Sequence, residues 1–184
     1  ILPDNSVKLF VGVEGKHDIS FLKGICRILR AGGEDVIDLD ALELDGQLIF
    51  FPFGGENLAL WASRLRPLNR PEFHICDRDN PPPQEPKYKS HIDDVNGRDG
   101  CSAVCTTKRE MENYIHHEAI VEAYRENGSS PAIGLPFQPF DDAPEIVAEA
   151  VHVASGSTTA WAALERDDQK KKSSRAKGIL NGPA

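Results

Sequence analysis

The 184-residue chain lacks the features that membrane-spanning and disulfide-held proteins need. No apolar run approaches the roughly 20 residues that cross a bilayer, so we expect no membrane contact. Only four cysteines are present. Cys26 and Cys76 fall within a helical and a strand pattern, and Cys101 and Cys105 flank an apolar stretch, so they form no disulfide framework. We therefore expect a protein of the reducing cytoplasm.

The sequence also has fewer basic than acidic residues, and it lacks a phosphate-binding loop motif. The chain has 21 Lys and Arg against 29 Asp and Glu, and its net charge of −8 excludes a generic basic nucleic-acid coat. An enzyme that acts on nucleic acid is not excluded, because clustered metal-binding carboxylates also lower the net charge. No Gly-x-x-x-x-Gly-Lys-Ser/Thr motif occurs, so ATP would bind only through a domain outside this chain. Because the first residue is Ile1 rather than methionine, we expect a piece of a longer protein.

Strand-like and helix-like segments alternate through the first two thirds of the sequence. This alternation predicts an α/β fold with a mainly parallel central sheet flanked by helices. Residues 35–45 are expected to be an irregular or edge segment, and the proline-led stretch 81–100 a long loop. The predicted strands are 7–13, 47–53, 72–77 and 101–106, and the predicted helices are 19–29, 56–65, 108–115 (capped by Thr107) and 118–126.

The last third changes character. Residues 128–144 are rich in Pro, Gly and Ser, and helical patterns follow at 144–154 and 158–165. The Lys/Arg run at 169–177 is typical of a solvated tail, and a strip of phosphate contacts is the functional alternative. We therefore divide the chain into a catalytic core, residues 1–126, and a helical extension with a basic tail, residues 127–184.

Pairs of acidic residues follow three of the predicted strands. The carboxyl ends of parallel strands share one edge of a sheet, where ligands of such folds bind. Carboxylates gathered there repel one another by on the order of several kcal/mol unless cations are present, and hard oxygen ligands suit Mg²⁺ or Mn²⁺. The candidate metal ligands are Glu14, Asp18, Asp77, Asp79, Glu110 and Glu112.

Each pair also has an ordinary structural explanation. Glu14 would be a turn carboxylate, and Asp18 would interact favourably with a helix N-terminus in any protein. Glu110 and Glu112 would lie in the first turn of a helix, where residues i and i+2 do not share a face. Both glutamates can bind one metal site only if Glu110 precedes the first full turn.

Three segments carry a resemblance to a known family. They are VEGKHD at 13–18, PFGGEN at 52–57 and KREMENY at 108–114, together with Asp77-x-Asp79 about sixty residues after Glu14. The chain resembles the TOPRIM domain shared by topoisomerases, bacterial primases and several nucleases. Within that group it is most similar to the TOPRIM nuclease portion of the OLD (overcoming lysogenization defect) family, over residues 7–126.

The resemblance implies a TOPRIM (Rossmann-like) fold and a two-metal endonuclease that cuts or nicks DNA. Glu14 and Asp18 would hold one Mg²⁺ or Mn²⁺ with Asp77 as a bridge, while Asp79, Glu110 and Glu112 would complete the second site. The family also uses a late lysine to stabilise phosphate charge, for which Lys177 is the candidate and residues 170–172 are alternatives. An ABC-type ATPase domain of the same polypeptide would precede this portion and assemble it into a homo-oligomer, in phage or plasmid defence or DNA processing.

Other functions remain open. A TOPRIM nuclease that processes RNA would share the same acidic residues. Asp77 could instead be the nucleophile of a haloacid-dehalogenase-type phosphatase. Cys101 and Cys105 with His116 and His117 could bind zinc, although their spacing matches no known finger. A module that binds metal or a partner without cutting is the non-enzymatic alternative.

Overall fold

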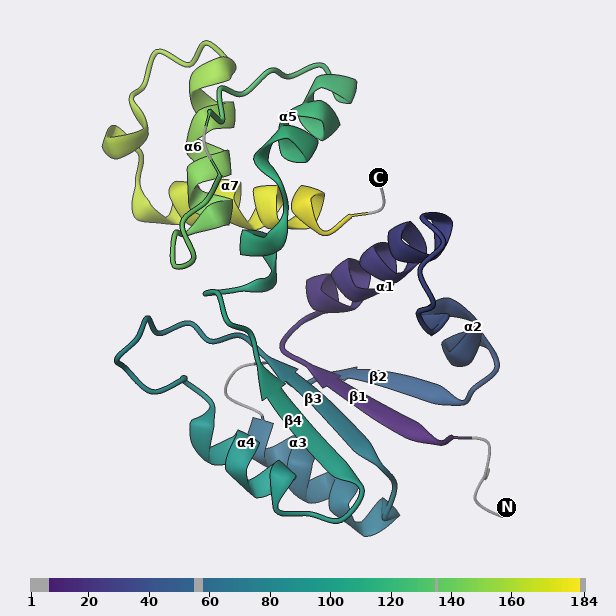
Figure 1. Cartoon of the computed structure of the whole chain (residues 1–184). Helices are drawn as coiled ribbons and strands as arrows, with labels where there is room; N and C mark the ends of the chain where they lie inside the picture. The colour runs from purple at the N-terminus through teal and green to yellow at the C-terminus, as the bar shows by residue number, and fades with distance from the viewer. Residues whose placement is uncertain (1–6, 55–57, 135, 183–184) are drawn as a thin grey trace.

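The computed structural model describes residues 7–54, 58–134 and 136–182 and contains one four-stranded sheet (Figure 1). All adjacent strands pair in parallel, in the order β2-β1-β3-β4, which confirms the predicted parallel α/β sheet. The chain moves from β1 outward to β2 and then to the other side of β1 with β3. A crevice at such a reversal is where open α/β sheets bind ligands. The strands are β1 (Leu9–Val13), β2 (Leu48–Pro52), β3 (Glu72–Cys76) and β4 (Cys101–Cys105).

Helices cover both faces of the sheet. On one face, Val11, Val13 and Phe50 pack against α1 and α2. On the other face, Phe53 and Cys76 pack against α4, and Figure 1 shows α3 beside α4. The helices are α1 (Lys16–Ala31), α2 (Leu39–Leu44), α3 (Leu58–Leu65, followed by the short 3-10 helix η2, Arg66–Leu68) and α4 (Lys89–Asn96).

Two of these helices correct the sequence prediction. Helix α2 lies within residues 35–45, where an irregular segment was expected; it is short, and Asp38 caps it by accepting from the Ala41 amide. Helix α4 interrupts the predicted loop 81–100. Its sequence is largely polar, because polar contacts hold it: Asn96 bonds both the amide and the carbonyl of Ala103 on β4.

A buried polar network also links α4 to β3. The Arg98 guanidinium, just after α4, forms two 2.9 Å bonds to Glu72, whose carboxylate contacts His74 at 2.8 Å. The other ring nitrogen of His74 lies 2.9 Å from His91 on α4. Burial alone would raise the pKa of Glu72, but its bonds to Arg98 and His74 lower it. Such a network explains why apolar periodicity did not reveal the helix.

The C-terminal helices form a second hydrophobic core beyond the carboxyl edge of the sheet (Figure 1). Ile120, Tyr124, Val147 and Ala176 lie within it, so α5 packs with the two helices that follow. The elements here are the 3-10 helix η3 (Met111–Tyr114), α5 (His117–Glu126), α6 (Ala143–Ala154), the 3-10 helix η4 (Trp161–Ala163) and α7 (Arg166–Leu180).

Three predictions for this region were wrong. The helix expected from Thr107 is only the 3-10 turn η3, whose N-cap is Glu110. The helix expected at 158–165 is only η4. The basic run at 169–177 is part of the 15-residue helix α7, because Ala176 and Leu180 anchor one side of it in the core. None of the helices within 7–54, 58–134 and 136–182 is long and apolar enough to cross a bilayer.

Candidate metal centre at the carboxyl edge of the sheet

The first acidic pair lies where β1 passes into α1. Glu14 follows the strand directly, and the Gly15 amide donates to Asp18 Oδ2 at 2.8 Å, which places Asp18 in the first helical turn. Asp18 is 3% exposed. Burial raises the pKa values of the Glu14 and Asp18 carboxyl groups above their ordinary values, although the hydrogen bonds that each group accepts oppose the shift.

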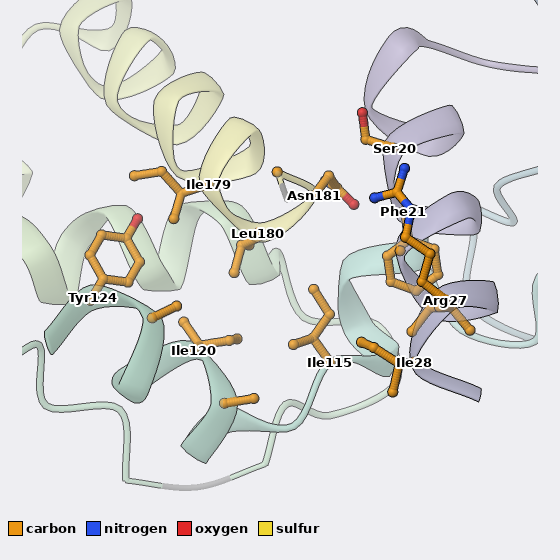
Figure 2. A pocket seen from close by; sticks show the side chains of 15 residues that line it. Ser20, Phe21, Arg27, Ile28, Ile115, Ile120, Tyr124, Ile179, Leu180 and Asn181 are labelled. Atoms are coloured by element: carbon orange, nitrogen blue, oxygen red, sulfur yellow. The ribbon is translucent and has the colours of Figure 1, made fainter. Parts of the chain in front are cut away.

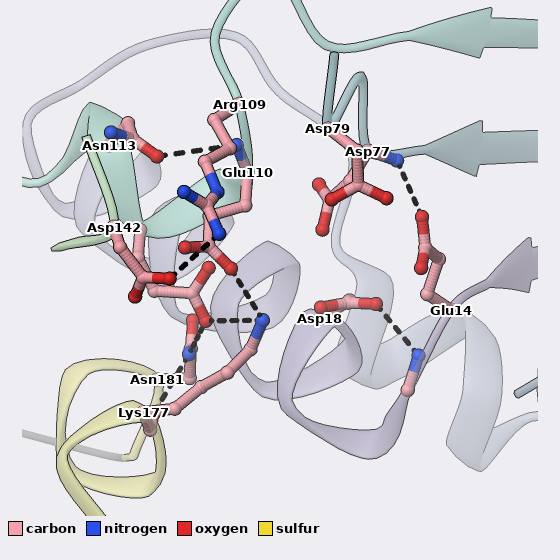
Figure 3. Close-up of polar contacts among 12 residues, drawn as sticks. Glu14, Asp18, Asp77, Asp79, Arg109, Glu110, Asn113, Asp142, Lys177 and Asn181 are labelled. Atoms are coloured by element: carbon pink, nitrogen blue, oxygen red, sulfur yellow. Dashed lines mark hydrogen bonds and ion pairs between the residues drawn. The ribbon is translucent and has the colours of Figure 1, made fainter. Parts of the chain in front are cut away.

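The second acidic pair follows β3, next to β1 in the sheet. The Asp77 amide donates to Glu14 Oε1 at 2.9 Å, so the two strand ends are directly joined (Figure 3). Asp79 adopts φ = 56°, a left-handed conformation that aspartate tolerates better than most residues, and Oδ2 of its carboxylate pairs with Lys87 at 2.7 Å. The tight turn therefore brings Asp77 and Asp79 to the same edge as Glu14.

Asp77 is the most strongly perturbed acid of the site. It is 6% exposed, and its Oδ1 is buried without a hydrogen-bond partner in the described part of the chain. Burial, followed by the charges of Glu14 and Asp18, raises the pKa of Asp77 to about 9. A carboxyl group in this position is either protonated or in need of a cation.

The third acidic pair follows β4 and meets α7. Glu110 has an extended backbone (φ = −148°) just before η3, and Glu112 lies inside that turn. The side chains therefore converge: Lys177 Nζ contacts Glu110 Oε2 at 3.0 Å and Glu112 Oε1 at 3.2 Å. Asn181 Nδ2 donates to Glu112 Oε1 at 2.6 Å. Glu110 thus precedes the helical turn, as simultaneous ligation requires.

Lys177 supplies the positive charge of the cluster. Burial alone would lower the pKa of Lys177, but the charges of Glu112 and Glu110 outweigh it and hold the pKa above its usual value. Lysines 170, 171 and 172 lie earlier in α7 and are exposed. Of the four lysines considered from the sequence, Lys177 is therefore the one that contacts the candidate ligands.

The structure brings all six predicted ligands to one sheet edge, in two sets. The residues after β1 and β3 form one set, and Glu110 and Glu112 around Lys177 form the other (Figure 3). The sets interact, because Lys177 lowers and Glu112 raises the pKa of Asp77. Within the described residues, no three Asp, Glu, His or Cys side chains are grouped closely enough to hold an ion as they stand.

The donor set nevertheless fits a hard divalent cation. Asp77 Oδ1, Glu110 Oε1 and Glu112 Oε2 are buried oxygens without hydrogen-bond partners among the described residues. Leaving such acceptors unpaired costs about 1–3 kcal/mol each, and more when they are charged. Carboxylate oxygens without sulfur or imidazole nitrogen are the donors that Mg²⁺ and Mn²⁺ prefer.

Residues that the sequence analysis missed also hold the site. The Tyr88 hydroxyl donates to Glu14 Oε2 at 3.1 Å, Lys87 pairs with Asp79, and Asn181 bonds Glu112. Tyr88 and Asn181 lie 74 and 69 residues from their partners, so no local spacing could have indicated them.

A mainly apolar cavity lies beside this centre rather than in it. Its volume is about 310 Å³, and it opens between α1, α5 and the end of α7 (Figure 2). Its walls are mainly apolar, including Phe21, Ile28, Ile120 and Ile179, and none of the six acids lines it. Such a surface does not suit a metal or a phosphate.

No family model, no curated protein and no solved structure matches this chain. The likeness to the TOPRIM and OLD families therefore stays a prediction from three short segments.

Proposed function

We propose that this chain is a Mg²⁺- or Mn²⁺-dependent nuclease module that cuts or nicks DNA, with the TOPRIM fold and the OLD-type site that its motifs resemble. The observation that carries the proposal is the junction of β1 and β3, where Glu14 and Asp77 lie side by side. Asp77 keeps a buried oxygen unpaired there.

The six acids and Lys177 would have different roles in this reaction. By the resemblance, Glu14, Asp18 and Asp77 would hold one cation. Asp79, which lies in the same set as these three acids, would share the second cation with Glu110 and Glu112. The cations, when bound, would activate the attacking water and stabilise the leaving oxygen. Lys177 stays protonated beside Glu110 and Glu112, and its ammonium would neutralise charge that develops on the scissile phosphate.

The setting of the module follows only from the resemblance. By that likeness it acts in the cytoplasm within an OLD-type protein, where an ABC-type ATPase domain of the same polypeptide would precede it and form a homo-oligomer. The biological role would be phage or plasmid defence or DNA processing. Structured RNA is the alternative substrate, because the same carboxylates would serve it.

The direct experiment is plasmid cleavage with Mn²⁺ by the wild-type chain and by Glu14→Gln and Asp77→Asn. These substitutions keep the side-chain shape but remove a charged ligand, so we expect the rate to fall by about a hundredfold or more. Glu118→Gln and Asp168→Asn are matched controls, since both acids are exposed and lie outside the six candidate ligands. Equal rates for the site variants and the controls would refute the proposal.

A second function has a specific observation in its favour. Lys177 already pairs with Glu110 and Glu112, and Lys87 pairs with Asp79, as they would in a module that binds metal or a partner without cutting. Calorimetric titration with Mn²⁺ distinguishes the two functions. Binding that depends on Glu14 and Asp77, with no cleavage of plasmid DNA or structured RNA, would establish the non-cutting alternative.

A further inference from the structure

Three cationic residues of α7 lie on the side of the helix that faces the candidate metal centre. At about 100° per residue, Arg166, Lys170 and Lys177 fall within about 40° of arc. The third of these, Lys177, points into the acidic cluster (Figure 3). Along the helix axis, Lys170 lies about 10 Å and Arg166 about 16 Å from Lys177. We call Arg166 and Lys170 the α7 stripe.

The stripe is available to a partner. Arg166 and Lys170 are both exposed, and neither side chain has an ion-pair partner within the described residues. The nearby acids Asp167 and Asp168 are turned away from the stripe by about 60° or more. Asp168 pairs with Lys171 instead, at 3.3 Å. The stripe therefore keeps its positive charge uncompensated in a chain of net charge −8.

The remaining cations of α7 face elsewhere. Lys172 and Arg175 line a cavity against Val151 and His152 of α6, on the side of the helix opposite the sheet edge. The basic run is thus divided by the helix into a side that leads to Lys177 and a side that does not. Sequence alone treats these residues as one run.

We propose that the α7 stripe binds the phosphates of duplex DNA and guides the scissile strand to Lys177. This inference rests on the proposed nuclease function and adds the path of the substrate. A DNA strand carries one phosphate per about 3.4 Å of duplex axis, so the 16 Å between Arg166 and Lys177 spans about five phosphates. The six carboxylates repel DNA, and cations beside them offset that repulsion where the strand approaches.

The test is a matched pair of charge reversals on the two sides of α7. The stripe variant is Arg166→Glu/Lys170→Glu, and the control is Lys171→Glu/Arg175→Glu, which changes the net charge equally on the same helix. Binding of a short fluorescein-labelled duplex is measured by anisotropy with Ca²⁺ as the only divalent cation, at several salt concentrations. Thermal unfolding of both variants checks that α7 remains folded.

We expect the stripe variant to bind the duplex about tenfold or more weakly than the wild-type chain. Its slope of log affinity against log salt concentration should be smaller in magnitude by about 2. The affinity of the control variant should change less than about twofold. Equal losses in both variants, or a wild-type chain that binds no duplex, would overturn the proposal. Preferential binding of structured RNA to the stripe would replace DNA as the ligand. Plasmid cleavage by the same proteins separates the nuclease hypothesis from the stripe hypothesis. Cleavage by the wild-type chain that is slower in the stripe variant than in the control supports both. Equal cleavage by the stripe variant and the wild-type chain refutes only the stripe hypothesis.

Discussion

At the scale of single residues, the orientation of Glu14 depends on partners from other elements. The Asp77 amide binds one of its carboxylate oxygens, and the Tyr88 hydroxyl binds the other at 3.1 Å. Tyr88 is only 8% exposed, and its ring packs edge-on against Phe53. Hydrogen bonds of this kind fix a metal ligand in its binding orientation.

The substitution Tyr88→Phe removes this hydroxyl and keeps the ring. We expect the affinity for Mn²⁺, measured by calorimetry, to fall about tenfold, because Glu14 loses the bond that orients it. Tyr124→Phe is the control, since Tyr124 is buried in the C-terminal core. If both variants bind Mn²⁺ as the wild type does, Tyr88 does not position Glu14.

At the scale of secondary-structure elements, replacing either of two glycines by alanine should change the free energy of unfolding, in opposite directions. A Cβ on Gly12 of β1 would lie 2.7 Å from Phe51 Cζ and 3.0 Å from His74 Nδ1. A Cβ on Gly178 of α7 would lie 3.6 Å from His17 Cε1, an ordinary contact. The first glycine allows β1 to pack closely, whereas the second only weakens its helix.

The pair Gly12→Ala and Gly178→Ala tests this difference by urea unfolding. Gly178→Ala should raise the free energy of unfolding by about 0.5–1 kcal/mol, because alanine favours the helix. Gly12→Ala should lower it by about 1–3 kcal/mol through overpacking. A loss of stability in Gly178→Ala would show that α7 and α1 pack more tightly than the structure indicates.

At the scale of the whole molecule, the centre is built where two cores meet. The segments that follow β1 and β3 supply four acids, the segment after β4 supplies two, and α7 supplies Lys177. Without cations this assembly holds buried carboxylates near one another, and the pKa of Asp77 rises to about 9. The folded metal-free chain therefore binds a proton that the unfolded chain releases near pH 4.

The sign of the pH effect follows from that raised pKa. The stabilising contribution of protonated Asp77 is complete below the unfolded value of 3.8 and is lost as pH rises toward about 9. By the proposed function, Mg²⁺ would replace this proton, so it should raise the melting temperature more at about pH 8 than at about pH 6. Thermal unfolding in EDTA and in Mg²⁺ at both pH values measures the difference. Asp77→Asn should abolish it, and an equal shift at both pH values would contradict the assignment.

The sequence by itself determined the parallel sheet and the candidate acids. Alternating apolar segments predicted all four strands to within about two residues of the observed bounds. The rule that parallel strands end at one edge predicts from the sequence alone that the acids lie together. Local pattern suffices here because strand burial follows from short apolar segments, and parallel strand direction follows from the alternation of those segments with helices.

Only the tertiary structure decided which other residues complete the centre. Apolar periodicity could not reveal α4, which is held by polar contacts such as that of Asn96, nor show that the basic run folds as α7. Tyr88, Asn181 and the choice of Lys177 depend on contacts across more than sixty residues. The Lys177 and Asn181 contacts join the C-terminal core to the sheet edge, and the Tyr88 contact joins the start of α4 to the end of β1. Side-chain spacing along the chain does not indicate either kind of contact.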